Sequence, residues 1–154
     1  MKLKQWMRNE SRSDIKVMLL DGGVSTHLEE NICTQLGFNP PFSIRSLWSS
    51  SLLLTKEGRQ AIQKCHEDFL FAGSNIITSV TYQLHYGCIG NEAVMDTGKS
   101  RPILIEDVDN FLRLGVTLAK EAIKKCDRED TAFVAASIGC YGASLADGSE
   151  YRGV

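Results

Sequence analysis

The sequence predicts an α/β fold that contains at least three parallel strands. Three short runs, residues 17–21, 75–82 and 131–138, are almost continuously apolar or β-branched, as strands covered on both faces are. The segments between these runs are long enough to hold crossover helices. Each run also ends in glycine or polar residues, which stop a strand. Alternation of strands and helices in this order is typical of parallel α/β architecture.

The first strand, over residues 17–21, is expected to end at Asp21-Gly22-Gly23, because consecutive glycines interrupt regular structure. A helix should follow, with Ser25 or Thr26 as its N-cap. The apolar face of this helix is predicted to carry Leu28 and Ile32. Residues 37–47 are predicted to form a loop, since Pro40-Pro41 cannot lie inside a helix or a central strand.

A longer helix is predicted from Lys56 to Ala72, before the second strand. Thr55 is its expected N-cap, and Gly73 is its expected C-terminal stop. Apolar residues recur at helical spacing along it: Ala61, Ile62, Cys65, Phe69 and Ala72.

The second half of the chain is expected to contain one long helix, from about Glu106 to Lys125. Acidic residues in its first turn and lysines in its last turn match the helix dipole. Residues 83–104 contain three glycines and a proline, and they are predicted to be irregular. Residues 140–154, after the third strand, are predicted to form a glycine-rich loop.

Composition limits the classes of partner. The chain has 154 residues and is 43% hydrophobic, which suits one domain with a buried core. A net charge of −2 gives no basic surface, so no nucleic-acid partner is expected. No apolar run approaches the roughly 20 residues that span a bilayer, so no membrane partner is expected. Five scattered cysteines without a CxxC pair favour a reducing, cytoplasmic environment.

Candidate site residues lie where the predicted strands end, because ligands of α/β folds bind at the C-terminal ends of strands. Asp21 allows two interpretations. Its carboxylate either fixes a substrate amine, with Gly22 and Gly23 letting the ligand approach the backbone, or caps the following helix. Thr81 and Tyr82 lie at the end of the second strand, and their pattern alone favours ordinary strand residues.

No metal site is predicted from the residues themselves. Cys65 and His66 are adjacent on a helix, where their side chains diverge by about 100°. Cys65 is therefore expected in the core, and His66 on the solvent side. His85 and Cys88 have a spacing that zinc tolerates, but two ligands do not make a site. Gly139-Cys140-Tyr141-Gly142 lacks the spacing of a phosphate-binding loop.

Several of these motifs together resemble the homocysteine S-methyltransferase family. Residues 19–23 resemble its opening strand and turn, and Leu47-Trp48-Ser49 resembles its "LWS" segment. Residues 78–83 resemble its "T-x-x-YQ" strand. The most specific match is residues 137–153, which follow the pattern "GPYGA-x-LADGSEY-x-G". The resemblance runs from about Val17 to Gly153, so residues 1–16 are expected to be an N-terminal extension.

This resemblance implies a βα barrel of the TIM type, of which residues 17–154 form about the first three units. It implies methyl transfer to homocysteine, giving methionine, from S-methylmethionine or S-adenosylmethionine. It places Asp21, Gly22 and Gly23 against homocysteine, and Thr81 and Tyr82 over the substrate pocket. Homocysteine and the sulfonium donor are then the expected ligands, and an incomplete barrel is expected to self-associate.

The same resemblance implies zinc that holds the homocysteine thiolate. The three cysteines that bind zinc in the family lie beyond the third strand, and no residue of this chain matches them. Cys140 stands where the family usually has proline. Two hypotheses follow. The chain is either part of a homocysteine methyltransferase, or a catalytically inactive fragment or remnant that lacks the zinc-binding half. In the second case it is either a non-catalytic remnant or a partner that pairs with a separate chain supplying the rest.

Overall fold

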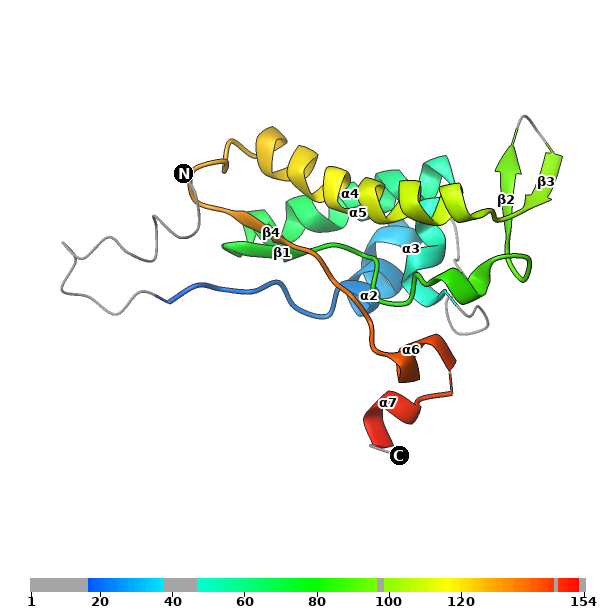
Figure 1. Ribbon diagram of the computed structural model, residues 1–154. Coiled ribbons are helices and arrows are strands. Elements are labelled where there is room, and N and C mark those ends of the chain that lie inside the picture. The colour runs from blue at the N-terminus through cyan, green and yellow to red at the C-terminus, as the bar shows by residue number, and fades with distance from the viewer. Residues whose placement is uncertain (1–16, 38–46, 97–98, 146, 153–154) are drawn as a thin grey trace.

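The computed structural model describes residues 17–37, 47–96, 99–145 and 147–152, which form a mixed α/β fold (Figure 1). The first part holds the helical turns α2 (Val24–His27), η1 (Leu28–Ile32) and α3 (Cys33–Gln35), then η3 (Trp48–Leu54) and α4 (Lys56–Phe71). The middle part holds β1 (Ile76–Thr78), η4 (Tyr86–Cys88), β2 (Ala93–Asp96) and β3 (Lys99–Pro102). The last part holds α5 (Ile105–Lys125), β4 (Phe133–Ala135), α6 (Tyr141–Leu145) and α7 (Ser149–Arg152).

The three segments predicted as strands lie side by side and run parallel. β1 pairs with β4 in parallel register, from Ile76 opposite Phe133 to Thr78 opposite Ala135. On the other side of β1, Leu20 forms a parallel bridge with Ile76. The predicted parallel arrangement of the three segments is thus confirmed.

The first strand is much shorter than the strand predicted over residues 17–21. Leu20 alone makes a bridge, flanked by the bonds from Ile76 N to Leu19 O at 3.0 Å and from Asp21 N to Ile76 O at 2.9 Å. The next amide along β1, that of Thr78, donates instead to the carboxylate of Asp21 at 2.7 Å. A side chain therefore replaces the backbone carbonyl that would have continued the ladder.

The other two strands are also shorter than predicted, because hydroxyl side chains replace backbone groups at their ends. Ser79 N still donates to Ala135 O at 3.0 Å. Beyond this bond, Ser137 N donates to the hydroxyl of Ser79 at 2.9 Å, and the hydroxyl of Thr81 donates to Ser137 O at 2.7 Å. Residues 79–81 are therefore hydrogen-bonded to Ser137, but these residues do not form a regular ladder.

Helices α4 and α5 pack against each other and against the β1–β4 sheet, on one face of it (Figure 1). Both match the predicted helices. Thr55 caps α4 by accepting a hydrogen bond from Gly58 N at 3.0 Å, and Gly73 ends it with φ +105°. The side of α5 that packs inward buries Val108, Phe111, Gly115, Leu118, Ala119 and Ala122.

The N-terminal helical segment differs from the prediction at its start. Its N-cap is Gly23, without a side-chain cap, so neither Ser25 nor Thr26 caps it. The hydroxyl of Ser25 instead donates to that of Ser49 at 2.8 Å, which links the segment to η3. Leu28 and Ile32 are both buried, as predicted.

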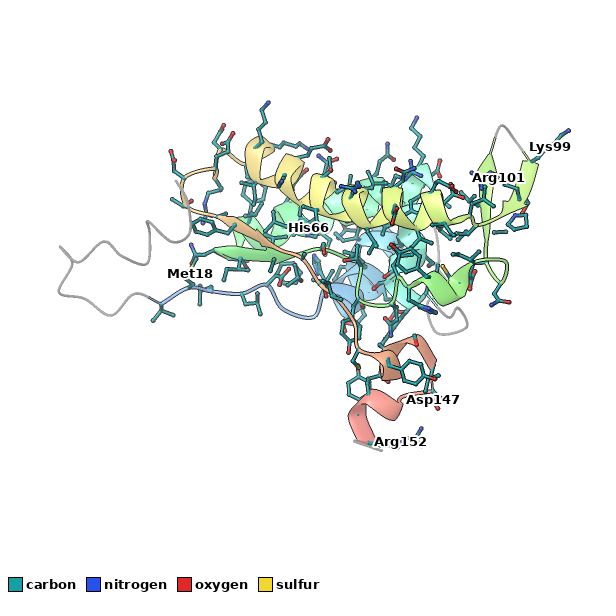
Figure 2. All side chains as sticks on the ribbon, in the orientation of Figure 1. Met18, His66, Lys99, Arg101, Asp147 and Arg152 are labelled. Carbon is teal, nitrogen blue, oxygen red and sulfur yellow. The ribbon has the colours of Figure 1, made fainter. Side chains whose placement is uncertain are left out.

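His66 was expected on the solvent side of α4 and is fully buried (Figure 2). The error comes from assigning α4 a single apolar face. The helix packs against η1 and η3 as well as α5 and β1, so it buries more than one side.

Residues 83–104 are not irregular throughout, because β2 and β3 pair as an antiparallel hairpin. The segment after β4 is not a simple loop either. It contains α6 and α7, which contact each other and lie beyond the C-terminal end of β4, on the side away from α4 and α5 (Figure 1). Arg152 donates to the carbonyl of Asp147 at 2.9 Å within it, and both residues are labelled in Figure 2. None of the helices in the described part of the chain has the length and hydropathy of a membrane span.

Candidate functional site

A cavity of about 260 Å³ lies at the C-terminal ends of the parallel segments. Its walls come from the start of α2, from η3, from the residues that follow β1 and β4, and from α7. The lining residues are Gly22, Gly23, Val24, Ser25, Thr26, Trp48, Ser49, Thr78, Ser79, Val80, Tyr82, Gln83, Ser137 and Tyr151. The fold thus brings four separate motifs of the sequence together around one space.

Gly22 and Gly23 both line this cavity, as the sequence analysis placed them. A Cβ at Gly22 would lie 3.3 Å from the ring of Phe69, and one at Gly23 would lie 3.4 Å from the hydroxyl of Thr26. The two glycines therefore offer backbone rather than side chains to the cavity.

Asp21 lies just before these glycines but is not among the cavity-lining residues. Its carboxylate accepts two hydrogen bonds from Thr78, one from the backbone N at 2.7 Å and one from the hydroxyl at 2.9 Å. Burial raises the pKa of Asp21, while the Thr78 bonds act in the opposite direction. Asp21 does not cap the following helix, so that interpretation of the sequence is wrong.

Thr81 is 3% exposed, and its hydroxyl is engaged with both Ser79 and Ser137. Its methyl group faces Gly115 of α5, where an added Cβ would come within 2.5 Å. Thr81 is therefore a packing and linking residue in this structure. It contributes to a second cavity of about 370 Å³, on the α5 side of the strand ends, rather than to the first.

Tyr82 is 38% exposed and lines both cavities. Its hydroxyl lies 4.0 Å from the sulfur of Cys140. This interaction raises the pKa of Tyr82, whereas hydrogen bonds, first that with the Ala143 backbone, lower the pKa of the Cys140 thiol. Of the five predicted site residues, Gly22, Gly23 and Tyr82 thus surround the first cavity, and Asp21 and Thr81 support its walls.

Several residues that line the cavity were not predicted as site residues, among them Trp48, Gln83 and Tyr151. Trp48 has φ +42°, a left-handed conformation that is unusual for a residue other than glycine. Gln83 is 6% exposed. Tyr151 comes from α7. All three belong to motifs of the family resemblance, which was the only signal available for them.

The described residues do not fit a zinc ion. They contain no group of three or more His, Cys, Asp or Glu side chains that could hold a metal. All five cysteines are free thiols. Burial raises the pKa of Cys33 to about 11 and also raises that of Cys65, which opposes the thiolate form that binds metal.

The sequence profile of a family described as homocysteine S-methyltransferase matches residues 18–154. The chain is 37% identical to homocysteine S-methyltransferase 2 of Zea mays and 36% identical to a selenocysteine Se-methyltransferase of Brassica oleracea var. italica. Each alignment covers 88% of this chain and 37% of the relative.

A solved structure is similar as well. The oxidised form of the homocysteine methyltransferase MmuM from Escherichia coli superposes with a TM-score of 0.67 at 30% identity, over 89% of this chain and 42% of that one. The chain therefore spans about two fifths of the length of the proteins that it matches.

Proposed function

This chain belongs to the homocysteine S-methyltransferase family, and we propose that it forms the N-terminal, homocysteine-binding part of such an enzyme. The reaction would transfer a methyl group from S-methylmethionine or S-adenosylmethionine to homocysteine and give methionine. The finer fold proposed with it is the first three units of a βα barrel. Reduced cysteines support a cytoplasmic location for the protein.

One observation carries this proposal. Four motifs that are far apart in the sequence meet around one cavity. They are the motif that begins at Asp21, the LWS segment, the end of β1 and the DGSEY segment. At about 260 Å³ the cavity is near the lower limit of small-molecule pockets, about 300 Å³, and it suits an amino-acid-sized ligand.

The residues around this cavity support binding and orientation of homocysteine. Thr78 fixes the carboxylate of Asp21 with two hydrogen bonds, and a carboxylate has about four lone-pair sites, so acceptor capacity remains for a substrate ammonium group. The backbone at Gly22 and Gly23 lets the ligand approach closely. Positioning the nucleophilic sulfur in line with a methyl donor is the contribution that such a site makes to catalysis.

The described residues do not supply the metal centre that the family resemblance implies, so no step is assigned to zinc in this chain.

Calorimetric titration with two ligands tests the proposed binding function. Homocysteine and 4-mercaptobutanoate differ by the amino group alone, so the preference for homocysteine measures recognition of the amine. We expect the chain to prefer homocysteine by roughly ten- to a hundredfold, the value of one charge-assisted hydrogen bond. Equal affinity for the two ligands, or no binding of either, would rule out the proposed amine site.

A further inference from the structure

A series of hydrogen-bonded side chains joins α2 to α4 just outside the strand-end cavity. Nε2 of His27 lies 3.0 Å from Oδ2 of Asp68, and Nδ1 of His27 lies 3.2 Å from the amide nitrogen of Asn31. Lys64, one turn before Asp68, donates to the other carboxylate oxygen, Oδ1. His27 and Asp68 are not among the residues that line the cavity, and the proposed contacts with substrate use neither of them.

The partners of His27 determine its tautomer. A carboxylate can only accept hydrogen bonds, so Nε2 must carry the proton that it donates to Asp68. The amide nitrogen of Asn31 can only donate, so Nδ1 must be the acceptor. The two contacts therefore agree on one neutral tautomer. The side chains of His27 and Asp68 are 28% and 27% exposed, so their bond should add only modestly to the stability of the whole fold.

The backbone of His27 is bonded directly to a glycine that lines the cavity. His27 N donates to Gly23 O at 2.9 Å, and Val24 N donates to Gly22 O at 2.9 Å. Helix α2 starts after Gly23, and no side chain caps it. Because glycine has the greatest backbone freedom, the turn from Gly22 to His27 needs restraint from another element to keep one position.

Helix α4 provides that restraint through two adjacent residues. The ring of Phe69 lies against Gly22, where an added Cβ would come within 3.3 Å of it. The same ring contacts His27 edge-on, with ring centroids 5.4 Å apart. Asp68 binds the imidazole of His27. One end of the glycine turn thus contacts Phe69, and the other end is hydrogen-bonded to Asp68.

We infer that His27 and Asp68 are positioning residues of the homocysteine site. Their hydrogen bond attaches the glycine turn to α4, which keeps the backbone of Gly22 and Gly23 where the ligand approaches. Neither His27 nor Asp68 would touch the ligand. A site that is ordered before the ligand arrives binds it more tightly, because less conformational freedom is lost on binding. This inference rests on the proposed function, because it concerns the same cavity.

Hydrogen exchange in the ligand-free chain tests the link between the turn and α4. The amide of Val24 donates to Gly22 O, so its exchange rate reports how often the turn opens. His27→Leu removes the bond to Asp68 and should raise this rate about three- to tenfold, the value of one hydrogen bond. His27→Gln keeps a side-chain N–H donor, so its exchange rate should stay within about twofold of wild type.

Calorimetric titration of the same samples tests the effect on the ligand. We expect His27→Leu to weaken binding of homocysteine about three- to tenfold. Binding of 4-mercaptobutanoate should weaken by the same factor, because the turn affects the part of the ligand that both compounds share. The preference for homocysteine, which measures recognition of the amine, should therefore stay unchanged.

Asp68→Leu should reproduce the losses of His27→Leu. The double variant should lose no more than either single variant, because the two residues act through one bond. If Asp68→Leu does not fold, His27→Leu and its rescue by His27→Gln still decide the outcome. Thermal melts of all variants check that each one folds.

Tyr86→Phe is the matched control. It removes another hydrogen bond between side chains of different elements, from the Tyr86 hydroxyl to Asp109 at 2.6 Å, and it keeps the ring. We expect this variant to change neither the exchange rate of the Val24 amide nor the binding of either ligand. Equal effects in Tyr86→Phe and His27→Leu would show that His27 contributes only to general stability.

Three further results would overturn the positioning role. They are unchanged exchange of the Val24 amide in His27→Leu, faster exchange without a loss of affinity, and equal losses in His27→Gln and His27→Leu. Failure of the proposed function would look different. If the wild type does not prefer homocysteine to 4-mercaptobutanoate, or binds neither, the proposed amine site is wrong. The exchange rates measured without ligand then still decide whether His27 and Asp68 hold the turn.

Discussion

The carboxylate of Asp21 accepts the backbone amide of Thr78 at 2.7 Å and its hydroxyl at 2.9 Å. The side chain of Asp21 thereby takes the place that its own carbonyl would hold in a parallel ladder. This arrangement ends the ladder and leaves the backbone of Gly22 and Gly23 at the cavity. The candidate substrate residue is thus also a structural residue, and the two roles must be separated experimentally.

Comparison of Asp21→Asn with Thr78→Val separates these roles. Each variant removes a hydrogen bond of the pair, so each should lower the free energy of unfolding by about 1–2 kcal/mol. Asp21→Asn alone removes the charge, so it should weaken homocysteine binding roughly ten- to a hundredfold, whereas Thr78→Val should cost less than about threefold. Urea denaturation and calorimetry measure the two quantities. Equal losses of affinity in the two variants would show that Asp21 acts only through the fold.

Gly115→Ala should destabilise the protein, because the new Cβ would lie 2.5 Å from the Thr81 methyl carbon. Overpacking of this kind typically costs about 1–3 kcal/mol, partly offset by the higher helix propensity of alanine. Thr81→Ser removes that methyl group and keeps the hydroxyl that bonds Ser137. The double variant should therefore recover most of the stability that Gly115→Ala loses in urea denaturation. A simple sum of the two single losses would mean that the two residues do not touch.

Acid should destabilise the fold through His66. Burial lowers the pKa of His66 to about 4, from an ordinary value of 6.5. The unfolded chain therefore binds a proton first as the pH falls. The stability associated with neutral His66 is complete above pH 6.5 and is lost progressively as the pH falls towards 4. At pH 5 the loss should be about 2 kcal/mol.

Urea denaturation at pH 7 and pH 5 measures this loss. His66→Leu should remove most of the difference between the two pH values, while the control His85→Leu should retain it. An unchanged pH dependence in His66→Leu would show that other groups account for the acid sensitivity.

The chain alone should transfer no methyl group at a useful rate. A free homocysteine thiol with a pKa near ~8.5 is only a few per cent thiolate at neutral pH. A catalytic zinc site needs three protein ligands, and the described residues contain no such group. The assay combines the purified chain with homocysteine and S-methylmethionine, with and without added zinc. Methionine formation that a chelator abolishes would contradict this prediction.

The chain should self-associate as its concentration rises. β1 is the only strand that β4 pairs with in the described part of the chain, so the opposite edge of β4 is free. Ile138, just beyond this strand, is 85% exposed. Free strand edges beside apolar side chains favour association. Sedimentation velocity over a range of concentrations should show a shift to larger species that Ile138→Lys reduces. A concentration-independent monomer would contradict the prediction.

The sequence by itself determined the two long helices, α4 and α5, and the parallel arrangement of the strands. Thr55 and Gly73 define the ends of α4 through local hydrogen bonding and backbone conformation, which depend on a few neighbouring residues. The apolar runs identified the three adjacent segments, because strands covered by helices require apolar side chains. The positions of Gly22, Gly23 and Tyr82 at strand ends could be predicted because these residues directly follow or end the apolar runs.

Tertiary structure alone decided where the strands end and which side chains form hydrogen bonds at those ends. Thr78, Thr81 and Ser137 bond to residues about 56–58 positions away, and no local pattern encodes such partners. The burial of His66 depends in the same way on several elements that pack around α4. Tyr151 reaches the cavity because α7 folds back beside α6, which required the space left by Gly142. Local preferences act over a few residues, whereas these contacts arise from how distant segments share the limited space at the strand ends.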